Sequence, residues 1–300
     1  MTVVCERHNR SVADLCYGPV TPDGVLLLTA SEDHTAILRN GETGGFIHKF
    51  EGHEGQVWSC DINSMGRLAA TASEDCTVRI WDINARQCVH KFSEGNIMQS
   101  CAFSLVGNYI VMGGFRDNLK LYDLHQVDTP IWQIANLDAC VRSVAWMDDH
   151  RLMVSFSDKV GFRVWDIRGP PCIKEIRTHS SVTSIELHQS KNYITTMSAN
   201  TATIWNLTFN PLVELCVPRI SESASFRPQN DILIVGGDDR VVRILGVKDR
   251  TEISVVGGGF HMGPIQCVRF SPNGQSFAAG SRDGRTIIRK IDIQMEDVND

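Results

Sequence analysis

Four side chains that could form a polar cluster occur within a short stretch of the chain: His53, Ser73, Asp75 and Trp81. A histidine held by a carboxylate can act in acid–base catalysis, or it can be a buried structural group with both ring nitrogens satisfied. We expect Asp75 to hold one ring nitrogen of His53 and Ser73 to hold the other, with Trp81 receiving a hydrogen bond at the edge. Because related sets recur along the chain, the structural interpretation is favoured and no catalytic residue is predicted.

Other patterns for enzyme chemistry are weak. No Gly-x-x-x-x-Gly-Lys phosphate loop occurs, and His53-Glu54 begins a zinc-protease motif without the second histidine four residues on. Cys5 and His8 have no second pair of ligands at metal spacing. The sequence therefore predicts a protein that is not an enzyme and that has no cofactor and no metal.

The chain has 300 residues with a net charge of −6, so no overall basic field favours nucleic acid. No run approaches 18 apolar residues, and we expect neither a membrane span nor a signal peptide. The ten cysteines include no Cys-x-x-Cys pair, and most fall at apolar strand positions, which indicates reduced thiols in a cytoplasmic, or also nuclear, protein.

The cluster belongs to a repeat that fills the sequence. The residue that ends the third strand of each unit recurs at spacings of 42, 41, 43, 40, 40 and 44: Arg39, Trp81, Tyr122, Trp165, Trp205, Leu245 and Arg289. Before each lies a short apolar, β-branched run and then a turn residue: Asp33, Asp75, Asp117, Asp158, Asn200, Asp239 and Asp283. A period of about 40–45 residues with Gly-His and Trp-Asp signatures is typical of a WD-repeat propeller blade.

The sequence therefore predicts an all-β, seven-bladed WD-repeat propeller that forms a single domain over residues 1–300. The last unit shows only three strands, so we expect residues 2–6 to supply its outer strand and close the ring. The other units carry incomplete polar clusters. The first has His8 but Arg39 in the tryptophan position, the fifth has His179, and the seventh has His261 with Arg289. Apolar packing between blades must then hold the ring together.

The remaining candidate for function is one rim of the ring. We expect the residues flanking the first buried apolar residue of each inner strand to point there: Ser11 and Ala13, Gln56 and Trp58, Asn96 and Met98, Cys140 and Arg142, Ser181 and Thr183, Arg219 and Ser221, Pro264 and Gln266. The residue before each turn joins them: Glu32, Glu74, Arg116, Ser157, Ala199, Asp238 and Arg282. Tryptophan and arginine are enriched at binding hot spots, so the partner-binding hypothesis rests on Gln56, Trp58, Glu74, Met98, Arg116, Arg142, Arg219, Gln266 and Arg282. Trp58 could instead pack against a neighbouring blade.

Several stretches resemble a particular WD-repeat family, the serine/threonine kinase receptor-associated proteins, also called unrip. The segment His261-Met262-Gly263-Pro264-Ile265-Gln266 is similar to its last blade, and Ala36-Ile37-Leu38-Arg39-Asn40-Gly41 to its first, including the arginine in the tryptophan position. The segment Gly52-His53-Glu54-Gly55-Gln56-Val57-Trp58 is similar to its second blade. The resemblance does not extend to the acidic segment that family members usually carry after the last blade.

The resemblance implies a monomeric, non-enzymatic scaffold. Family members associate with the survival-of-motor-neuron complex, which assembles spliceosomal ribonucleoproteins, through Gemin proteins. They also bind the RNA-binding protein unr and modulate receptor-kinase signalling. An alternative is the propeller subunit of eukaryotic initiation factor 3, which shares the Gly-Pro-Ile segment of the last blade. A third is an enzyme that uses the central channel.

Overall fold

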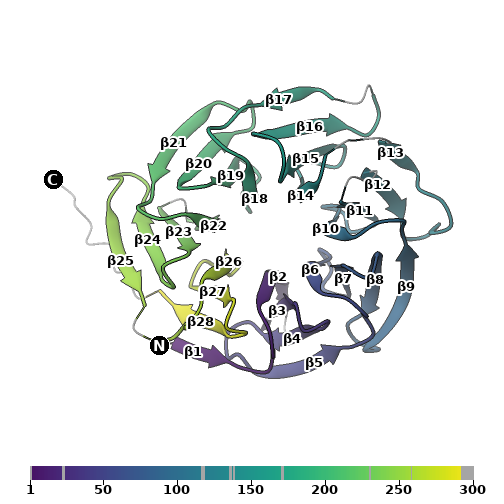
Figure 1. Cartoon of the computed structure of the whole chain (residues 1–300), viewed down its shortest axis with the longest axis horizontal. Helices are drawn as coiled ribbons and strands as arrows, with labels where there is room; N and C mark the ends of the chain where they lie inside the picture. The colour runs from purple at the N-terminus through teal and green to yellow at the C-terminus, as the bar shows by residue number, and fades with distance from the viewer. Residues whose placement is uncertain are drawn as a thin grey trace.

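A computed structural model describes residues 2–21, 24–115, 119–134, 137, 139–169, 172–229, 231–257 and 259–291. Within these ranges the chain is built from strands and contains no helix. The strands form seven four-stranded antiparallel sheets, arranged as blades around a central axis (Figure 1). No helix in the described part of the chain has the length and apolarity needed to cross a bilayer.

Each blade runs from an inner strand at the axis to an outer strand at the perimeter. Blades 1 to 3 are β2 (Val12–Thr21), β3 (Gly24–Ser31), β4 (Ala36–Asn40), β5 (Phe46–Phe50); β6 (Val57–Ile62), β7 (Leu68–Ser73), β8 (Thr77–Asp82), β9 (Gln87–Ser93); and β10 (Met98–Phe103), β11 (Tyr109–Gly114), β12 (Leu119–Asp123), β13 (Trp132–Ile134). Blades 4 and 5 are β14 (Val141–Trp146), β15 (Arg151–Phe156), β16 (Phe162–Asp166), β17 (Lys174–Ile176); and β18 (Val182–Leu187), β19 (Tyr193–Ser198), β20 (Thr201–Asn206), β21 (Pro211–Cys216). Blades 6 and 7 are β22 (Ser221–Phe226), β23 (Ile232–Gly237), β24 (Val242–Gly246), β25 (Glu252–Val256); and β26 (Ile265–Phe270), β27 (Ser276–Ser281), β28 (Thr286–Lys290) with β1 (Thr2–Cys5).

The N-terminal strand closes the ring. Strand β1 pairs antiparallel with β28, with Thr2 opposite Arg289 and Cys5 opposite Thr286, so the two ends of the chain share one sheet (Figure 1). Arg39 of blade 1 is 3% exposed and its Nη2 donates a 2.6 Å hydrogen bond to the Glu6 carbonyl. The arginine in the tryptophan position therefore ties the closing strand to the first blade. The predicted fold class, including closure by the N-terminal strand, is confirmed.

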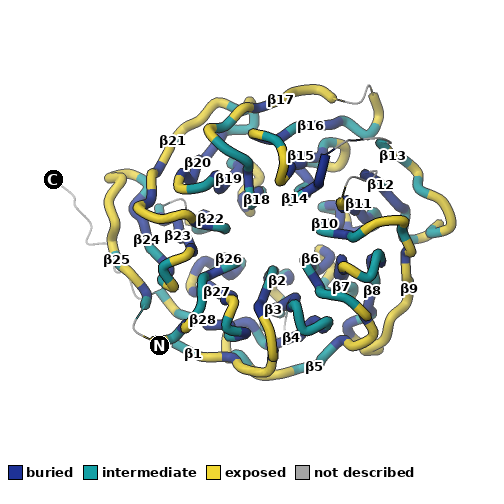
Figure 2. Tube along the Cα trace, in the orientation of Figure 1, coloured by how far each residue is buried: buried dark blue, intermediate teal, exposed yellow. Residues whose placement is uncertain are grey.

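The apolar core lies between blades. Seven clusters of buried side chains each combine residues from two adjacent blades, and one joins blade 7 to blade 1 through Val12, Leu15, Cys267 and Ile288. Burial decreases from the inner to the outer strands (Figure 2). A β-sheet buried on both faces needs a neighbour on each side, which a closed ring supplies to every blade.

In some blades the second strand carries a glycine that leaves room for a side chain of the next blade, namely the first residue of its inner strand. A Cβ on Gly236 would stand 2.4 Å from Ile265 Cγ2, and one on Gly280 would stand 2.6 Å from Val12 Cγ1. Blade 5 has the large and small residues the other way round. Met197 stands where blade 6 has Gly236, and the inner strand of the next blade begins with the small Ser221.

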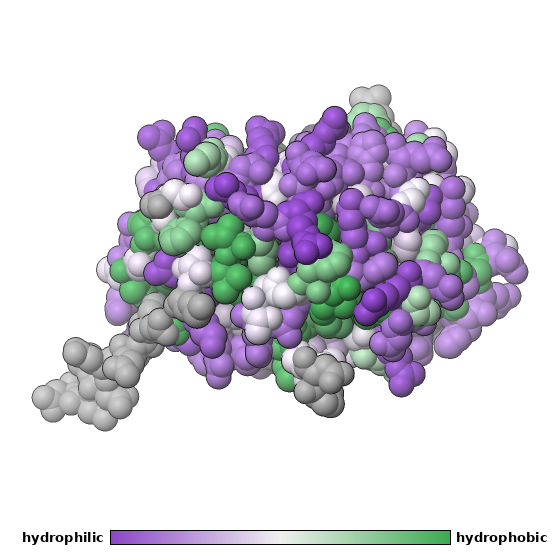
Figure 3. Space-filling model, turned by 90° about the horizontal axis from the view of Figure 1, so that it is seen from below, coloured by the Kyte–Doolittle hydropathy of each residue, from purple (hydrophilic) through white to green (hydrophobic). Residues whose placement is uncertain are grey.

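The outer wall presents the free edges of the sheets. Exposed apolar side chains there include Val4 of β1, Phe46 of β5, and Ile253 and Val255 of β25. One view of the wall shows apolar side chains interspersed with hydrophilic ones (Figure 3). Charged residues on these edge strands, such as Glu252, discourage pairing with another chain.

Candidate functional site

The polar cluster of blade 2 is organised by Thr71. His53 Nδ1 lies 2.8 Å from Asp75 Oδ2, and His53 Nε2 lies 2.7 Å from Thr71 Oγ1. The Trp81 indole N–H donates to the same hydroxyl over 2.9 Å. A neutral His53 satisfies every group: Trp81 donates to Thr71, Thr71 donates to His53, and His53 donates to Asp75. Because His53 is buried and both ring nitrogens are occupied, the cluster supports the blade and leaves no free base.

The pKa values agree with this role. Burial lowers the pKa of His53 below its usual value, although the hydrogen bond to Asp75 opposes the shift. Burial alone would raise the pKa of Asp75, but hydrogen bonds from Thr77 and His53 hold it at about 2. The pair is therefore a neutral imidazole donating to a carboxylate at neutral pH.

Two details of the predicted cluster are wrong. Ser73 does not reach His53; its hydroxyl donates to the Gly55 carbonyl over 3.1 Å and accepts from the Asp75 N–H over 3.2 Å. Trp81 donates its hydrogen bond instead of receiving one. Side chains two residues apart share a strand face, so Thr71 and Ser73 were equivalent candidates. A threonine recurs at the Thr71 offset as Thr29 and Thr196, but a serine also recurs at the Ser73 offset as Ser31, Ser198 and Ser281, so the sequence holds no signal that separates the two.

The other blades carry parts of the cluster. His8 of blade 1 contacts Asp33 and Thr29, each at 2.9 Å. Trp205 of blade 5 donates to Thr196 over 2.8 Å, whereas His179 is exposed and lies outside the cluster that the sequence assigned to it. His261 of blade 7 lies 3.7 Å from Asp283, with no hydrogen bond at either ring nitrogen. Most blades therefore lack the complete cluster, whereas an apolar cluster lies between every pair of neighbouring blades.

The central channel is a polar cavity of about 280 Å³. Each inner strand begins with a buried residue, and its second residue lines the channel at one end. We call these second residues the mouth ring: Ala13, Trp58, Gln99, Arg142, Thr183, Glu222 and Gln266. Arg142 Nη2 lies 3.5 Å from Glu222 Oε2, an ion pair that joins blades 4 and 6 past the blade between them. Both side chains are partly exposed, so the pair contributes little to stability and mainly narrows the opening.

The nine residues of the partner-binding hypothesis fall into four groups, of which the last is Met98 and Arg219. Trp58, Arg142 and Gln266 belong to the mouth ring, and all three are half-buried. Gln56, Glu74 and Arg282 lie at the outer edge of the same rim, since the Glu74 N–H donates to the Gln56 carbonyl over 2.8 Å and the Arg282 N–H to the Pro264 carbonyl over 2.9 Å. Arg116 and the predicted turn residue Asp117 lie outside the described residues.

Met98 and Arg219 are misplaced in the prediction. Met98 is 1% exposed and is the buried first residue of β10, so it belongs to the core and Gln99 takes the rim position. Strand β22 likewise begins with the buried Ser221, which puts Glu222 in the mouth ring and Arg219 outside it. In both blades an apolar residue, Ile97 or Ile220, stands just before the strand and mimics the buried first residue in the sequence pattern. The sequence therefore missed Gln99 and Glu222.

The cysteines and possible metal ligands complete the inventory. All ten cysteines are free thiols, as predicted. Four of them, Cys16, Cys60, Cys101 and Cys267, line the channel. Burial raises the pKa of each of these thiols, which makes them poor nucleophiles. In the part of the chain that the structure describes, no group of three or more His, Cys, Asp or Glu side chains could hold a metal ion.

The closed ring of seven four-stranded sheets with a Trp–His–Asp cluster defines a WD-repeat propeller, and the profile of the "WD domain, G-beta repeat" family matches residues 2–40, 44–82 and 259–288. The chain is 34% identical over 284 residues to the serine-threonine kinase receptor-associated protein of Dictyostelium discoideum, covering 94% of this chain and 96% of the relative. It is 30% identical to the Homo sapiens protein of the same name, covering 94% of this chain and 80% of the relative. The chain belongs to the serine-threonine kinase receptor-associated protein family. Similarity to eukaryotic translation initiation factor 3 subunit I is weaker, at 23% identity to the Nematostella vectensis protein.

Proposed function

We propose that this propeller is a non-enzymatic scaffold whose partners bind across the mouth of the central channel. The observation that carries the proposal is the position of Trp58, a half-buried tryptophan on the mouth ring with Arg142 and Gln266 on the same ring. A large, stiff aromatic side chain that is partly exposed on the same ring as an arginine supplies the contact area typical of a binding hot spot.

The family supports a finer proposal. We propose that the chain associates with Gemin proteins of the survival-of-motor-neuron complex and so takes part in spliceosomal ribonucleoprotein assembly, mRNA processing and mRNA splicing. A protein related to unr and a receptor kinase are further proposed partners. We place these roles in the cytoplasm and nucleus, with the propeller a monomer that contacts proteins and neither nucleic acid nor membrane directly.

Affinity capture from the source cell followed by mass spectrometry tests this finer proposal. Recovery of Gemin and Sm proteins supports it. Recovery of initiation-factor subunits supports instead the second candidate, a propeller subunit of initiation factor 3, which the weaker similarity over 97% of this chain favours.

The rim is tested by Trp58→Ala and Arg142→Ala in the same capture, with circular dichroism to verify the fold. We expect each substitution to reduce recovery of the partner at least tenfold. Met65→Ala is the matched control, because Met65 is exposed in the turn after β6, at the opposite end of that strand from Trp58. Unchanged recovery by both rim variants would reject the channel mouth as the binding surface.

A further inference from the structure

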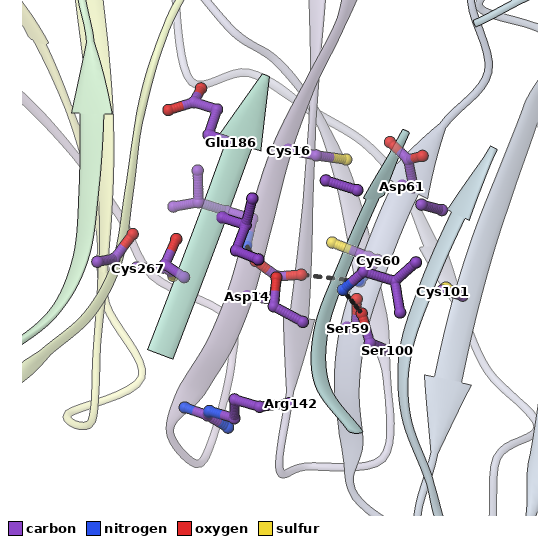
Figure 4. Close-up of a pocket in the computed structure, with 18 of the residues that line it drawn as sticks. Asp14, Cys16, Ser59, Cys60, Asp61, Ser100, Cys101, Arg142, Glu186 and Cys267 are labelled. Carbon is purple, nitrogen blue, oxygen red and sulfur yellow. Dashed lines mark hydrogen bonds between the residues drawn. The ribbon is translucent and has the colours of Figure 1, made fainter. Parts of the chain in front are cut away.

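Below the mouth ring, two more rings of side chains line the channel. The third residues of the inner strands form a middle ring: Asp14, Ser59, Ser100, Ser143, Ser184, Ser223 and Cys267. The fifth residues form a lower ring, of which six line the channel: Cys16, Asp61, Ala102, Ala145, Glu186 and Arg269. The seventh, Ser225, is fully buried and does not line the cavity. Figure 4 shows Asp61 and Glu186 at one level of the wall, with Asp14 and then Arg142 toward the other end. The channel thus holds three carboxylates and one guanidinium beyond the Arg142–Glu222 pair at the mouth.

These rings join neighbouring blades. Asp14 Oδ2 accepts a 3.2 Å hydrogen bond from the Cys60 N–H of blade 2. Asp61 Oδ2 accepts one of 2.8 Å from the Phe103 N–H of blade 3. The same positions in other blades do this without charge: Ser100 accepts from Val144 N over 3.1 Å, Ser223 from Val268 N over 3.2 Å, and Ser225 from Phe270 N over 3.1 Å. A neutral hydroxyl is sufficient to accept the backbone hydrogen bond from the next blade. That hydrogen bond therefore does not explain why Asp14 and Asp61 are carboxylates.

The carboxylates also lack a cation in contact. Among the described residues, no ion pair within 4.0 Å involves Asp14, Asp61 or Glu186. Arg269 Nη1 donates to Ser223 Oγ over 2.9 Å and to the Val268 carbonyl over 2.8 Å. Burial raises the pKa of Asp61 to about 7, and the nearby Asp14 adds to the rise while Arg269 opposes it. Arg269 attracts Asp14 and Glu186 without making an ion pair with either. One guanidinium faces three carboxylates, and because buried negative charge is costly, a further bound cation would lower that cost.

Two acceptors deep in the channel are free. Ser184 is 7% exposed and its Oγ has no hydrogen-bond partner. Glu186, two residues along β18 and so on the same strand face, uses Oε1 to accept from Ser225 over 3.1 Å but leaves Oε2 without a partner. Buried polar atoms in proteins are normally satisfied. A carboxylate can only accept, so its missing partner is a donor.

We propose that the channel receives a basic side chain, the guanidinium of an arginine or the ammonium of a lysine, from a protein bound at the mouth. Either group supplies several donors and a positive charge, which match Asp61, Glu186 and Ser184. The cavity of about 280 Å³ is slightly smaller than typical small-molecule pockets, which measure about 300–1,000 Å³, and so suits one extended side chain. Trp58 at the entrance offers an aromatic face to a passing cation. The inference rests on the proposed binding face and names the chemistry it recognises.

Calorimetric titration of the full chain with blocked tripeptides tests the proposal. Gly-Arg-Gly and Gly-Lys-Gly are compared with Gly-citrulline-Gly, the neutral isostere of the arginine peptide, and with Gly-Glu-Gly. We expect a basic peptide to bind at least tenfold more tightly than the other two. We also expect its affinity to rise as pH increases through about 7, because Asp61 then ionises.

Variants locate the site. Glu186→Gln and Asp61→Asn should each weaken binding of the basic peptide at least tenfold. Glu186→Gln retains an oxygen that can accept from Ser225, and Asp61→Asn retains one that can accept from Phe103 N but loses the acceptor for Ile62 N. Glu51→Gln, which changes an exposed carboxylate outside the channel lining, should leave affinity unchanged. Spermidine serves as a free cation, and binding of spermidine without binding of either basic peptide would overturn the proposal of a protein side chain.

Equal affinity for the arginine and citrulline peptides, or full affinity in both channel variants with the fold retained, would also overturn it. These outcomes are separate from the proposed scaffold function. If basic peptides do not bind while Trp58→Ala still abolishes capture of the partner, the channel inference fails and the binding face stands.

Discussion

Trp81 donates its indole N–H to Thr71 Oγ1 over 2.9 Å, and both side chains are buried between blades 1 and 2. The same hydroxyl lies 2.7 Å from His53 Nε2. Thr71 of β7 thus forms hydrogen bonds with a tryptophan of β8 and with a histidine in the loop before β6. It links three separate segments of the blade.

The first prediction concerns this hydroxyl. Thr71→Val keeps the shape of the side chain but leaves the Trp81 N–H and one His53 nitrogen without partners. Each unsatisfied buried group costs about 1–3 kcal/mol, so we expect a loss of about 2–4 kcal/mol, measured as a lower midpoint of urea or thermal unfolding. Thr195→Val is the matched control, because Thr195 is 1% exposed and its hydroxyl has no partner. Removing that hydroxyl should be neutral or stabilising, and equal losses in the two variants would contradict the role of Thr71.

The second prediction concerns ring closure. In β1, Val3 packs against the apolar cluster between blades 7 and 1, while the neighbouring Val4 points to solvent and is 40% exposed. Val3→Asp should destabilise the closed ring by about 1–3 kcal/mol, because it places a charge at a partly buried apolar site. It should also accelerate hydrogen exchange of the β28 amides. Val4→Asp, with the same chemistry on the other face, should change both quantities little. Similar effects of the two substitutions would show that side-chain packing of β1 does not hold the ring.

The repeat period was enough to predict seven blades and the closing strand, because each blade must bury both faces and the last unit had only three strands of its own. Residue-level positions depended on strand register, which periodicity determines less well. In blades 3 and 6 the chain places Ile97 and Ile220 just outside the inner strand, and Ile220 is 57% exposed. An apolar residue at a rim looks the same in sequence as one in the core. A register error of one residue therefore predicts Met98 and Ser221 at the rim, where the structure has Gln99 and Glu222.

The grouping of the channel carboxylates could not be predicted from the sequence, for a different reason. Asp14, Asp61 and Glu186 are far apart along the chain, and each looks like a solvent-facing residue of an alternating strand. Only closure of the ring brings their strands to one axis. The polar cluster of blade 2 was easier to predict because its members come from a single repeat.

The third prediction concerns packing between blades. Gly236→Ala would place a Cβ 2.4 Å from Ile265 Cγ2 and 2.8 Å from Val268 Cγ1, both in the next blade. Overpacking of this kind typically costs about 1–3 kcal/mol, and we expect a lower midpoint of thermal unfolding by that measure. Gly169→Ala is the control, since a Cβ there meets nothing within 4 Å. If Gly236→Ala were as stable as the control, the blades would have room to separate and the close approach would not limit stability.

The fourth prediction concerns pH. The pKa of Asp61 is about 7 in the folded protein, above the unfolded value of about 3.9, so between these limits the folded state holds a proton that the unfolded state has released. This group therefore does not destabilise the protein below pH 4, and it destabilises it increasingly as pH rises, with the full effect above pH 7.

Asp61→Asn removes the effect and keeps an oxygen to accept from Phe103 N. We expect the two proteins to unfold at the same midpoint near pH 4 and the variant to be more stable by about 1–2 kcal/mol at pH 8, a value reduced because the carboxyl is partly reached by water. Glu186, whose pKa burial also raises, remains in both proteins. Asp14 interacts with Asp61, so part of the expected difference is relief of the repulsion between these two carboxylates. If the difference in unfolding free energy between the two proteins stayed constant from pH 4 to pH 8, ionisation of Asp61 would not be the cause of the difference.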